Sequence, residues 1–487
     1  MNRISKIQFI SGALWKMIEE VSSKGISFIV SVILARLIAP ADYGLIAVTA
    51  IFTNFSDILI DGGFSTALIR KESVDEYDYS CVMIASMAIA IILYGVIFGI
   101  SPFVADYYGE PALKLILRVI GLVLFIQAFS SARNAVIHRS MRFKLLFYCN
   151  MAGSLFSGIF GIIAAYQGMG VWALVIQQLS QNVIVTFLIF INLHWKFCWK
   201  FRLGRFKEIL HFSIGVLSAS FLNYIGSALY NLIIGKRYSL TDLGYSEKGT
   251  QLPMQASLYT FSAISSVLLP TLSSYQDDIV CFKRILRKVI HMTAFLIFPI
   301  MVGMMTVSKE LIVVLLTSKW LPAVMIMKFS CIYYMATPFM LINIQVFYAL
   351  GHSFLRVKTE IIRLGMLVLS LIIFCFIFQC DINQLAFINA MIAVLISIIT
   401  FMEIRKLVSY SLKEVLEDIE KPFLCSGIMG IAIIFFNLII EGINIYSYLF
   451  ALIAKVIFGF FIYLIITVVW KVNALEDIMQ NLKIFRK

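Results

Sequence analysis

Long apolar runs, each bounded by charged residues, glycine or proline, recur along almost the whole chain. A helix needs about 20 predominantly apolar residues to cross the hydrocarbon core of a bilayer. Fourteen runs reach that length, at 11–37, 43–66, 79–103, 112–135, 145–167, 170–193, 208–235, 251–274, 285–307, 322–350, 360–379, 383–403, 423–440 and 447–470. The pattern predicts an all-α polytopic membrane protein with about 14 transmembrane helices and almost no soluble mass.

Composition agrees with this class, since hydrophobic residues make up 61% of the 487 residues and charged residues only 14%. The net charge of +13 could suggest a nucleic-acid partner. Lysine and arginine, however, accumulate in the cytoplasmic loops of membrane proteins. Basic residues here gather in alternate loops, at 3–6, 70–71, 133–144, 196–207, 283–288, 356–358, 405–421 and the C-terminal tail. We therefore expect both termini in the cytoplasm and no nucleic-acid partner.

The opposite, outer side is poor in basic residues, and its longest loop is expected at 236–250. The longest inner segment, 405–422, has apolar residues at helical spacing and is predicted to be an amphipathic cytoplasmic linker. The N-terminus is short and basic, but the run that follows it carries charges and is too long for a cleavable signal peptide.

Two stretches 200 positions apart suggest an internal repeat, since ARLIAPADYG at 35–44 aligns with GKRYSLTDLG at 235–244. Arg36 then meets Lys236, and Gly44 meets Gly244. We predict an N-terminal six-helix bundle at 1–207, a C-terminal six-helix bundle at 208–404, and, after the linker, a helix pair and tail at 423–487. Two halves in the same orientation, with a substrate site between them, are typical of transporters.

Ionisable residues inside the runs are candidate functional groups, because charge at membrane depth is costly. Lys16, Glu20 and Lys24 share one face of the first run, and Asp57 lies on a polar face of the second. These residues could form a structural zipper of ion pairs between two helices. Alternatively, Lys24 binds an anionic head group while Asp57 and Glu20 couple transport to an ion.

Arg118 and Lys328 are predicted substrate contacts because each lies about two turns into a helix entered from outside, at equivalent positions of the repeat. The alternative is that both side chains snorkel toward the outer head groups. Arg36 and Asn223 complete the predicted substrate-binding set. Asn223 is one of several intramembrane amides that serve either sugar binding or interhelical hydrogen bonds.

Motifs of enzyme chemistry are absent from the sequence, which has no GxSxG, no HExxH and no phosphate-binding glycine-rich loop. The eight cysteines include no CxxC pair, and the five histidines are scattered. We therefore expect no catalytic residues, no metal and no cofactor. Without an ATP site, uphill transport would draw on an ion gradient or on the gradient of the substrate.

Several sequence blocks resemble the Wzx-type polysaccharide and O-antigen flippases of the multidrug/oligosaccharidyl-lipid/polysaccharide exporter superfamily. They are Trp15 with Glu19, LARLIAPADYG at 34–44, DGGFSTALI at 61–69, RSMRFK at 139–144, GVWALV at 170–175, and LGY at 243–245 followed by LPTLS at 269–273. The resemblance covers roughly residues 10–360 and rests beyond that on the number of runs.

The resemblance implies a flippase that moves an undecaprenyl-diphosphate-linked oligosaccharide, a repeat unit of O-antigen, capsule or exopolysaccharide, to the outer leaflet. It also implies alternating access in a bacterial inner membrane, with membrane lipids, a polysaccharide polymerase and chain-length proteins as further partners. Two alternatives are a drug or cation antiporter of the same superfamily and a membrane-embedded glycan polymerase or glycosyltransferase. Outer loops of about 15 residues leave little room for the enzymes.

Overall fold

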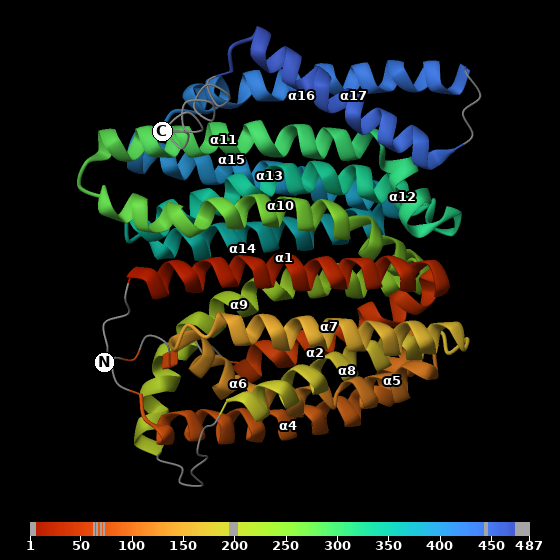
Figure 1. Ribbon diagram of the computed structural model, residues 1–487, viewed down its shortest axis with the longest axis vertical. Helices are drawn as coiled ribbons and strands as arrows, with labels where there is room; N and C mark the ends of the chain where they lie inside the picture. Colours follow the sequence, from red (N-terminus) through yellow and green to blue (C-terminus); the bar gives the residue numbers. More distant parts are fainter. Residues whose placement is uncertain are drawn as a thin grey trace. The chain divides into compact units, whose positions relative to one another are not determined.

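The computed structural model describes residues 6–61, 64, 67–68, 71, 74–193, 203–442 and 447–472. By contacts the chain divides into two compact units, unit 1 at Met1–Gly244 and unit 2 at Tyr245–Lys487. Unit 1 holds α1 (Lys6–Leu37), α2 (Pro40–Asp61), α4 (Glu76–Tyr108), α5 (Ala112–Ile120), α6 (Val123–Arg139), α7 (Phe143–Tyr166), α8 (Val171–Asn192) and α9 (Leu203–Arg237) (Figure 1). Helix α10 (Leu240–Ser274) begins in unit 1 and continues into unit 2.

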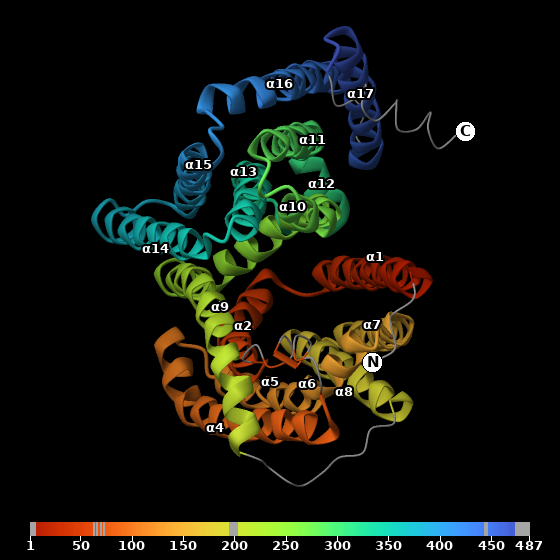
Figure 2. The same ribbon diagram turned by 90° about the vertical axis from the view of Figure 1, so that its left-hand side faces the viewer.

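Unit 2 is also helical throughout its described residues. It holds α11 (Ile279–Thr306), α12 (Ser308–Leu316), the short η1 (Ser318–Trp320), α13 (Ala323–Ala349), α14 (Ser353–Ser370), the π-helical η2 (Leu371–Ile377), α15 (Ile382–Val408), α16 (Leu412–Gly442) and α17 (Tyr448–Val469) (Figure 2).

Eleven helices in the described part of the chain are long and apolar enough to cross a membrane. They coincide with the predicted runs two to six and nine to fourteen. The three remaining runs lie on α1, α9 and α10, which are 32, 35 and 35 residues long. The predicted class, an all-α multi-pass membrane protein, is confirmed.

Within unit 1, α7 packs closely against both α1 and α8 because its facing positions are glycine. A Cβ on Gly153 would lie 2.3 Å from Val185 of α8, and one on Gly158 would lie 2.4 Å from Val30 of α1. Small residues let backbones approach where lipid supplies no hydrophobic drive for helix association.

The two repeat-related stretches contact each other where α2 and α10 begin. A Cβ on Gly44 would lie 1.8 Å from the carbonyl oxygen of Leu240, and a Cβ on Gly244 would lie 2.0 Å from that of Pro40. Residue 240 is the repeat equivalent of residue 40, so the contact is reciprocal, as in a two-fold symmetric interface. The geometry supports the predicted repeat at this point.

Three predicted boundaries differ from the structure, each for a local reason. The fourth run breaks at Gly121, which the ring of Tyr94 approaches so closely that a Cβ would lie 3.1 Å from it. Most of the expected outer loop, from Leu240 onward, is helical because Ser239 caps α10 through the N–H of Asp242 at 3.0 Å. The second half of the expected linker is the start of α16, where Ser411 and Glu414 form a capping box.

Four of the prolines inside helices, Pro102, Pro299, Pro338 and Pro422, each leave one carbonyl without its intrahelical donor, because proline has no N–H. In every case a polar side chain from elsewhere contacts that carbonyl. Arg118 reaches Phe98 O (3.4 Å), Tyr463 reaches Phe295 O (2.8 Å), Ser257 reaches Tyr334 O (2.9 Å), and His291 reaches Asp418 O (2.6 Å). The kinks are therefore fixed by tertiary hydrogen bonds.

In unit 2 the beginnings of α11 and α16 are joined by a charged network. Arg287 donates two hydrogen bonds to Asp418, at 2.8 and 2.7 Å, and Lys283 pairs with Glu414 at 2.8 Å. Tyr410, between α15 and α16, donates to Asp418 at 2.7 Å. Burial, together with this hydrogen bond, raises the pKa of Tyr410, so the phenol keeps its donor proton.

Candidate functional site

The polar face of α2 is present as predicted. Asn54, Asp57 and Asp61 are all exposed, and their spacing puts them on one side of the helix. Their carboxylates lie in a helix apolar enough to cross the membrane. Such a face offers oxygen ligands to a cation or hydrogen-bond acceptors to sugar hydroxyls.

The polar face of α1 is described in part. Lys24 is exposed, whereas the side chains of Lys16 and Glu20 lie outside the described residues. Glu19 is buried and accepts a hydrogen bond from Asn150 of α7 at 2.8 Å. Glu19 therefore joins α1 to α7, while Lys24 presents its ammonium at the helix surface.

Arg118, a predicted substrate contact, is held against α4. Its Nε donates to Ser101 Oγ at 2.9 Å, and its guanidinium carbon lies 3.7 Å from the centre of the Phe98 ring. A second nitrogen reaches the Phe98 carbonyl that Pro102 leaves without a donor. These contacts give Arg118 a structural task at the kink of α4.

Lys328, the repeat equivalent of Arg118, has a different setting. It is half-buried on α13, and no described side chain or carbonyl hydrogen bonds to its Nζ. In unit 2 the equivalent proline-exposed carbonyl, Phe295 O, is bound by Tyr463 instead. Lys328 therefore does not contact a proline-exposed carbonyl in the way that Arg118 does.

Arg36 is exposed in the last turn of α1, where a cation is favourable beside the negative end of the helix dipole. The side chain of Asn223 lies outside the described residues. Its neighbour Tyr224 donates a hydrogen bond to Ile51 O, and the rings of Phe221 and Phe55 lie 5.7 Å apart, so this part of α9 packs on α2.

A buried ion pair escaped sequence analysis. Lys455 of α17, 2% exposed, lies 2.5 Å from Glu310 at the start of α12. The second carboxylate oxygen of Glu310 is buried with no hydrogen-bond partner among the described residues. Lys455 is a lone charge in an apolar run, which is a signal visible in the sequence. Its partner 145 positions away is not.

A second missed pair lies on α14, where Arg363 donates to Glu360 at 2.9 Å and both side chains are largely buried. Polar residues of α13 and α15, Thr337 and Asn389, line a small cavity beside Arg363. The two charges are an i, i+3 pair, so one helical face carries both. The pair marks a polar spot in the interior of unit 2.

Metal chemistry finds no support in the described residues, where no three His, Cys, Asp or Glu side chains gather. Five of the seven cysteines in the described part of the chain are buried. The candidate residues on the membrane-spanning helices include lysines and arginines, which can bind anionic groups, and carboxylates, which can bind cations. Such a set is suited to binding and release.

The profile of a family described as polysaccharide biosynthesis protein matches residues 33–325, more than half of the chain. The chain belongs to this family. As the sequence predicts, it is a protein of polysaccharide biosynthesis. It is 23% identical to the teichuronic acid biosynthesis protein TuaB of Bacillus subtilis, over 87% of this chain and 88% of TuaB. It is 22% identical to the succinoglycan biosynthesis transport protein ExoT of Rhizobium meliloti, over 63% of this chain and 62% of ExoT.

Solved structures confirm the fold of this family member. The lipid II flippase MurJ, in an inward closed conformation, matches with a TM-score of 0.73 at 17% identity, over 94% of this chain and 98% of MurJ. An inward-facing multidrug resistance transporter of the MATE family matches with a TM-score of 0.64 at 14% identity, over 81% of this chain and 98% of the transporter. The fold is that of the MOP superfamily.

Proposed function

We propose that this protein moves a polyprenyl-diphosphate-linked oligosaccharide from the cytoplasmic to the outer leaflet by alternating access. Membership of the polysaccharide biosynthesis family carries the proposal. TuaB and ExoT, whose names place them in the biosynthesis of teichuronic acid and succinoglycan, support it. A polymerase and chain-length proteins would then act on the exported product.

The chemistry of the substrate fits the side chains present. A diphosphate is recognised by lysine and arginine, and Lys24 and Lys328 carry cations on transmembrane helices. Sugar hydroxyls need acceptors and amides, which the Asn54–Asp57–Asp61 face of α2 supplies. The polyprenyl tail can stay in lipid, so only the polar head group needs a path through the protein.

The test of this proposal removes the cations singly. We expect Lys24→Ala, Arg118→Ala and Lys328→Ala each to lower surface glycan in cells that depend on this gene, with membrane expression confirmed. Lys114→Ala, which removes an exposed lysine at the start of α5, is the matched control. Deletion of the gene should leave lipid-linked oligosaccharide in the cytoplasmic leaflet. Undiminished export in all three variants would refute these roles.

Arg118 needs a separate readout because it also fixes the kink of α4. Arg118→Ala is expected to lower both thermal stability and export, whereas Lys328→Ala should lower export alone. A Lys328 variant that loses stability and keeps its export per folded molecule would assign that lysine to structure.

The second candidate is a cation antiporter. The exposed carboxylates Asp57 and Asp61 of α2 favour it, together with the MATE-like fold. In that case Asp57→Asn would abolish efflux of an organic cation from cells, and deletion of the gene would leave surface glycan unchanged. A flippase predicts the opposite pair of results.

A further inference from the structure

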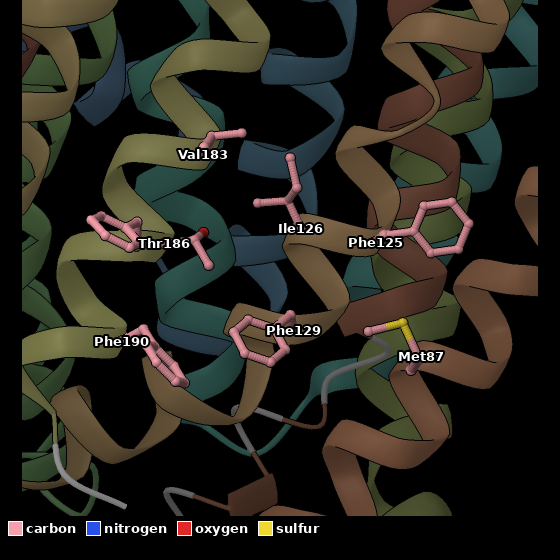
Figure 3. A pocket seen from close by; sticks show the side chains of 8 residues that line it. Met87, Phe125, Ile126, Phe129, Val183, Thr186 and Phe190 are labelled. Carbon is pink, nitrogen blue, oxygen red and sulfur yellow. The ribbon is translucent and has the colours of Figure 1, made fainter.

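An apolar groove runs along the surface of unit 1 between α4, α6 and α8 (Figure 3). Its volume of about 490 Å³ is within the range of ligand sites. Half of its lining residues are phenylalanines, and the full set is Met87, Phe125, Ile126, Phe129, Val183, Thr186, Phe187 and Phe190. Figure 3 shows Phe129 and Phe190 together at one end and Val183 with Ile126 toward the other.

A buried cation lies at the end of this groove that Phe129 and Phe190 form. Arg133, 4% exposed, follows Phe129 by one helical turn. Its guanidinium carbon lies 4.2 Å from the centre of the Phe129 ring and 4.7 Å from that of Phe190, and Nη1 donates to Phe129 O at 3.1 Å. The groove is therefore apolar along its length and positively charged at one end.

The depth of the cation follows from its position on α6. The helix ends at Arg139, six residues after Arg133, which is about 9 Å along the axis. Phe125, at the other end of the lining, precedes Arg133 by eight residues, or about 12 Å in the opposite direction. The guanidinium thus lies on the head-group side, and the groove leads from it toward the middle of the bilayer.

We propose that this groove binds the chain of a polyprenyl diphosphate, with the phosphate at Arg133. The groove is a single apolar slot with one cation, which matches a lipid with one chain and an anionic head group. Arginine binds phosphate with two parallel N–H donors. On the predicted topology the Arg133 end faces the cytoplasmic leaflet, where the lipid-linked substrate of the proposed function is made. The choice of lipid rests on that proposed function.

Access to the cation requires the ring of Phe190 to turn aside. Phe190 is 51% exposed, and exposed side chains change rotamer in picoseconds to nanoseconds. A phosphate can then replace the ring faces as the partner of the guanidinium, while the apolar chain covers Phe125, Phe129 and Phe187. The Arg133 guanidinium then loses a cation–π contact and gains a charge-assisted hydrogen bond.

The test measures binding of polyprenyl diphosphate to the full-length protein in lipid nanodiscs. Val183→Trp fills the groove, and Arg133→Gln removes the charge. We expect each substitution to weaken the affinity for polyprenyl diphosphate about tenfold. This is the effect expected from the loss of one charge-assisted hydrogen bond or of the apolar contacts of one side chain. Ile159→Trp, at a 49% exposed position of α7 outside the groove lining, is the matched control and should bind normally.

Polyprenol, which lacks the phosphate, separates the two halves of the site. Val183→Trp should weaken binding of polyprenol, whereas Arg133→Gln should leave it unchanged. Arg133→Lys keeps the charge but loses the paired N–H donors, so it should retain more diphosphate affinity than Arg133→Gln, which guards against misfolding of the glutamine variant. Affinity for the diphosphate that is unchanged in Val183→Trp would overturn the inference.

Competition by phosphatidylglycerol at the same concentration as polyprenyl diphosphate would also overturn it, because the groove would then hold ordinary membrane lipid. The binding assay involves no transport, so its result is separate from the proposed function. Intact groove binding without any export in cells would refute the flippase proposal alone. Normal export with no groove binding would refute the groove alone.

Discussion

Two glycines that the repeat aligns, Gly44 and Gly244, are required by the same close contact. Each faces a backbone carbonyl of the other helix start, Leu240 O and Pro40 O, at a distance where no side-chain atom fits. A carbonyl cannot rotate aside as a side chain can, so a methyl group must move a whole helix. The basic residues of these stretches, Arg36, Lys236 and Arg237, are in contrast exposed.

Gly44→Ala and Gly244→Ala should each destabilise the protein by about 1–3 kcal/mol, the usual cost of overpacking. Thermal unfolding in detergent measures the effect. Gly95→Ala is the control, because no atom lies within 4 Å of its Cβ position and alanine favours the helix. Equal unfolding temperatures for Gly44→Ala and Gly95→Ala would show that the crossing of α2 and α10 is looser than the structure has it.

At the scale of elements, α17 is attached to the rest of unit 2 by two buried polar contacts. Lys455 pairs with Glu310 of α12, and Tyr463 donates to the carbonyl of Phe295 that Pro299 leaves open on α11. Apolar packing alone distinguishes poorly between helix positions in lipid, where tails are as apolar as leucine. The two contacts therefore set the position of α17 along its neighbours.

A double-mutant cycle tests the ion pair. Lys455→Met or Glu310→Gln alone should cost about 3–5 kcal/mol, since each leaves one buried group without its partner. The double variant should recover most of that loss, because no unpaired buried charge remains. Unfolding temperatures of the four proteins give the coupling. Additive losses in the double variant would mean that the two side chains act independently.

The helices themselves could be predicted from apolar runs, but their interruptions and pairings could not. The break at Gly121 lies where the ring of Tyr94, a tertiary neighbour, packs against it. The early starts of α10 and α16 do have local sequence signals, the Ser–x–x–acid patterns at Ser239 and Ser411. The charge and hydropathy of these segments nevertheless favoured later starts of the membrane-spanning runs.

Less of the candidate site than of the fold could be predicted from the sequence. Arg118 and Lys328 align in the repeat, but their contacts differ. Arg118 contacts the carbonyl that Pro102 leaves without a donor, whereas in unit 2 Tyr463, and not Lys328, contacts the corresponding carbonyl. The Lys455–Glu310 pair joins residues 145 positions apart, a separation at which sequence patterns carry no pairing information. The roles of Lys24, Asp57 and the other proposed residues stay predictions.

At the scale of the whole molecule, several of the described connections between membrane helices are short turns. Four residues separate the end of α7 at Tyr166 from the start of α8, and three separate α6 from α7. Such turns leave basic residues as the main determinant of orientation. The alternation of basic and non-basic turns extends through both units, so it predicts one orientation for the entire chain.

This orientation can be tested at two turns of unit 1. Tyr166→Cys, at a position 74% exposed where α7 ends, should react in intact cells with a thiol reagent that cannot cross membranes. Ser140→Cys, in the exposed turn between α6 and α7, should react only after the membrane is opened. The parent chain, whose cysteines are mostly buried, gives the background. The physical reason is the cluster of basic residues beside Ser140, which holds that turn in the cytoplasm, whereas the turn after Tyr166 carries no charge. Labelling with the reverse pattern would invert the chain, and with it the direction in which the Arg133 end of the groove faces.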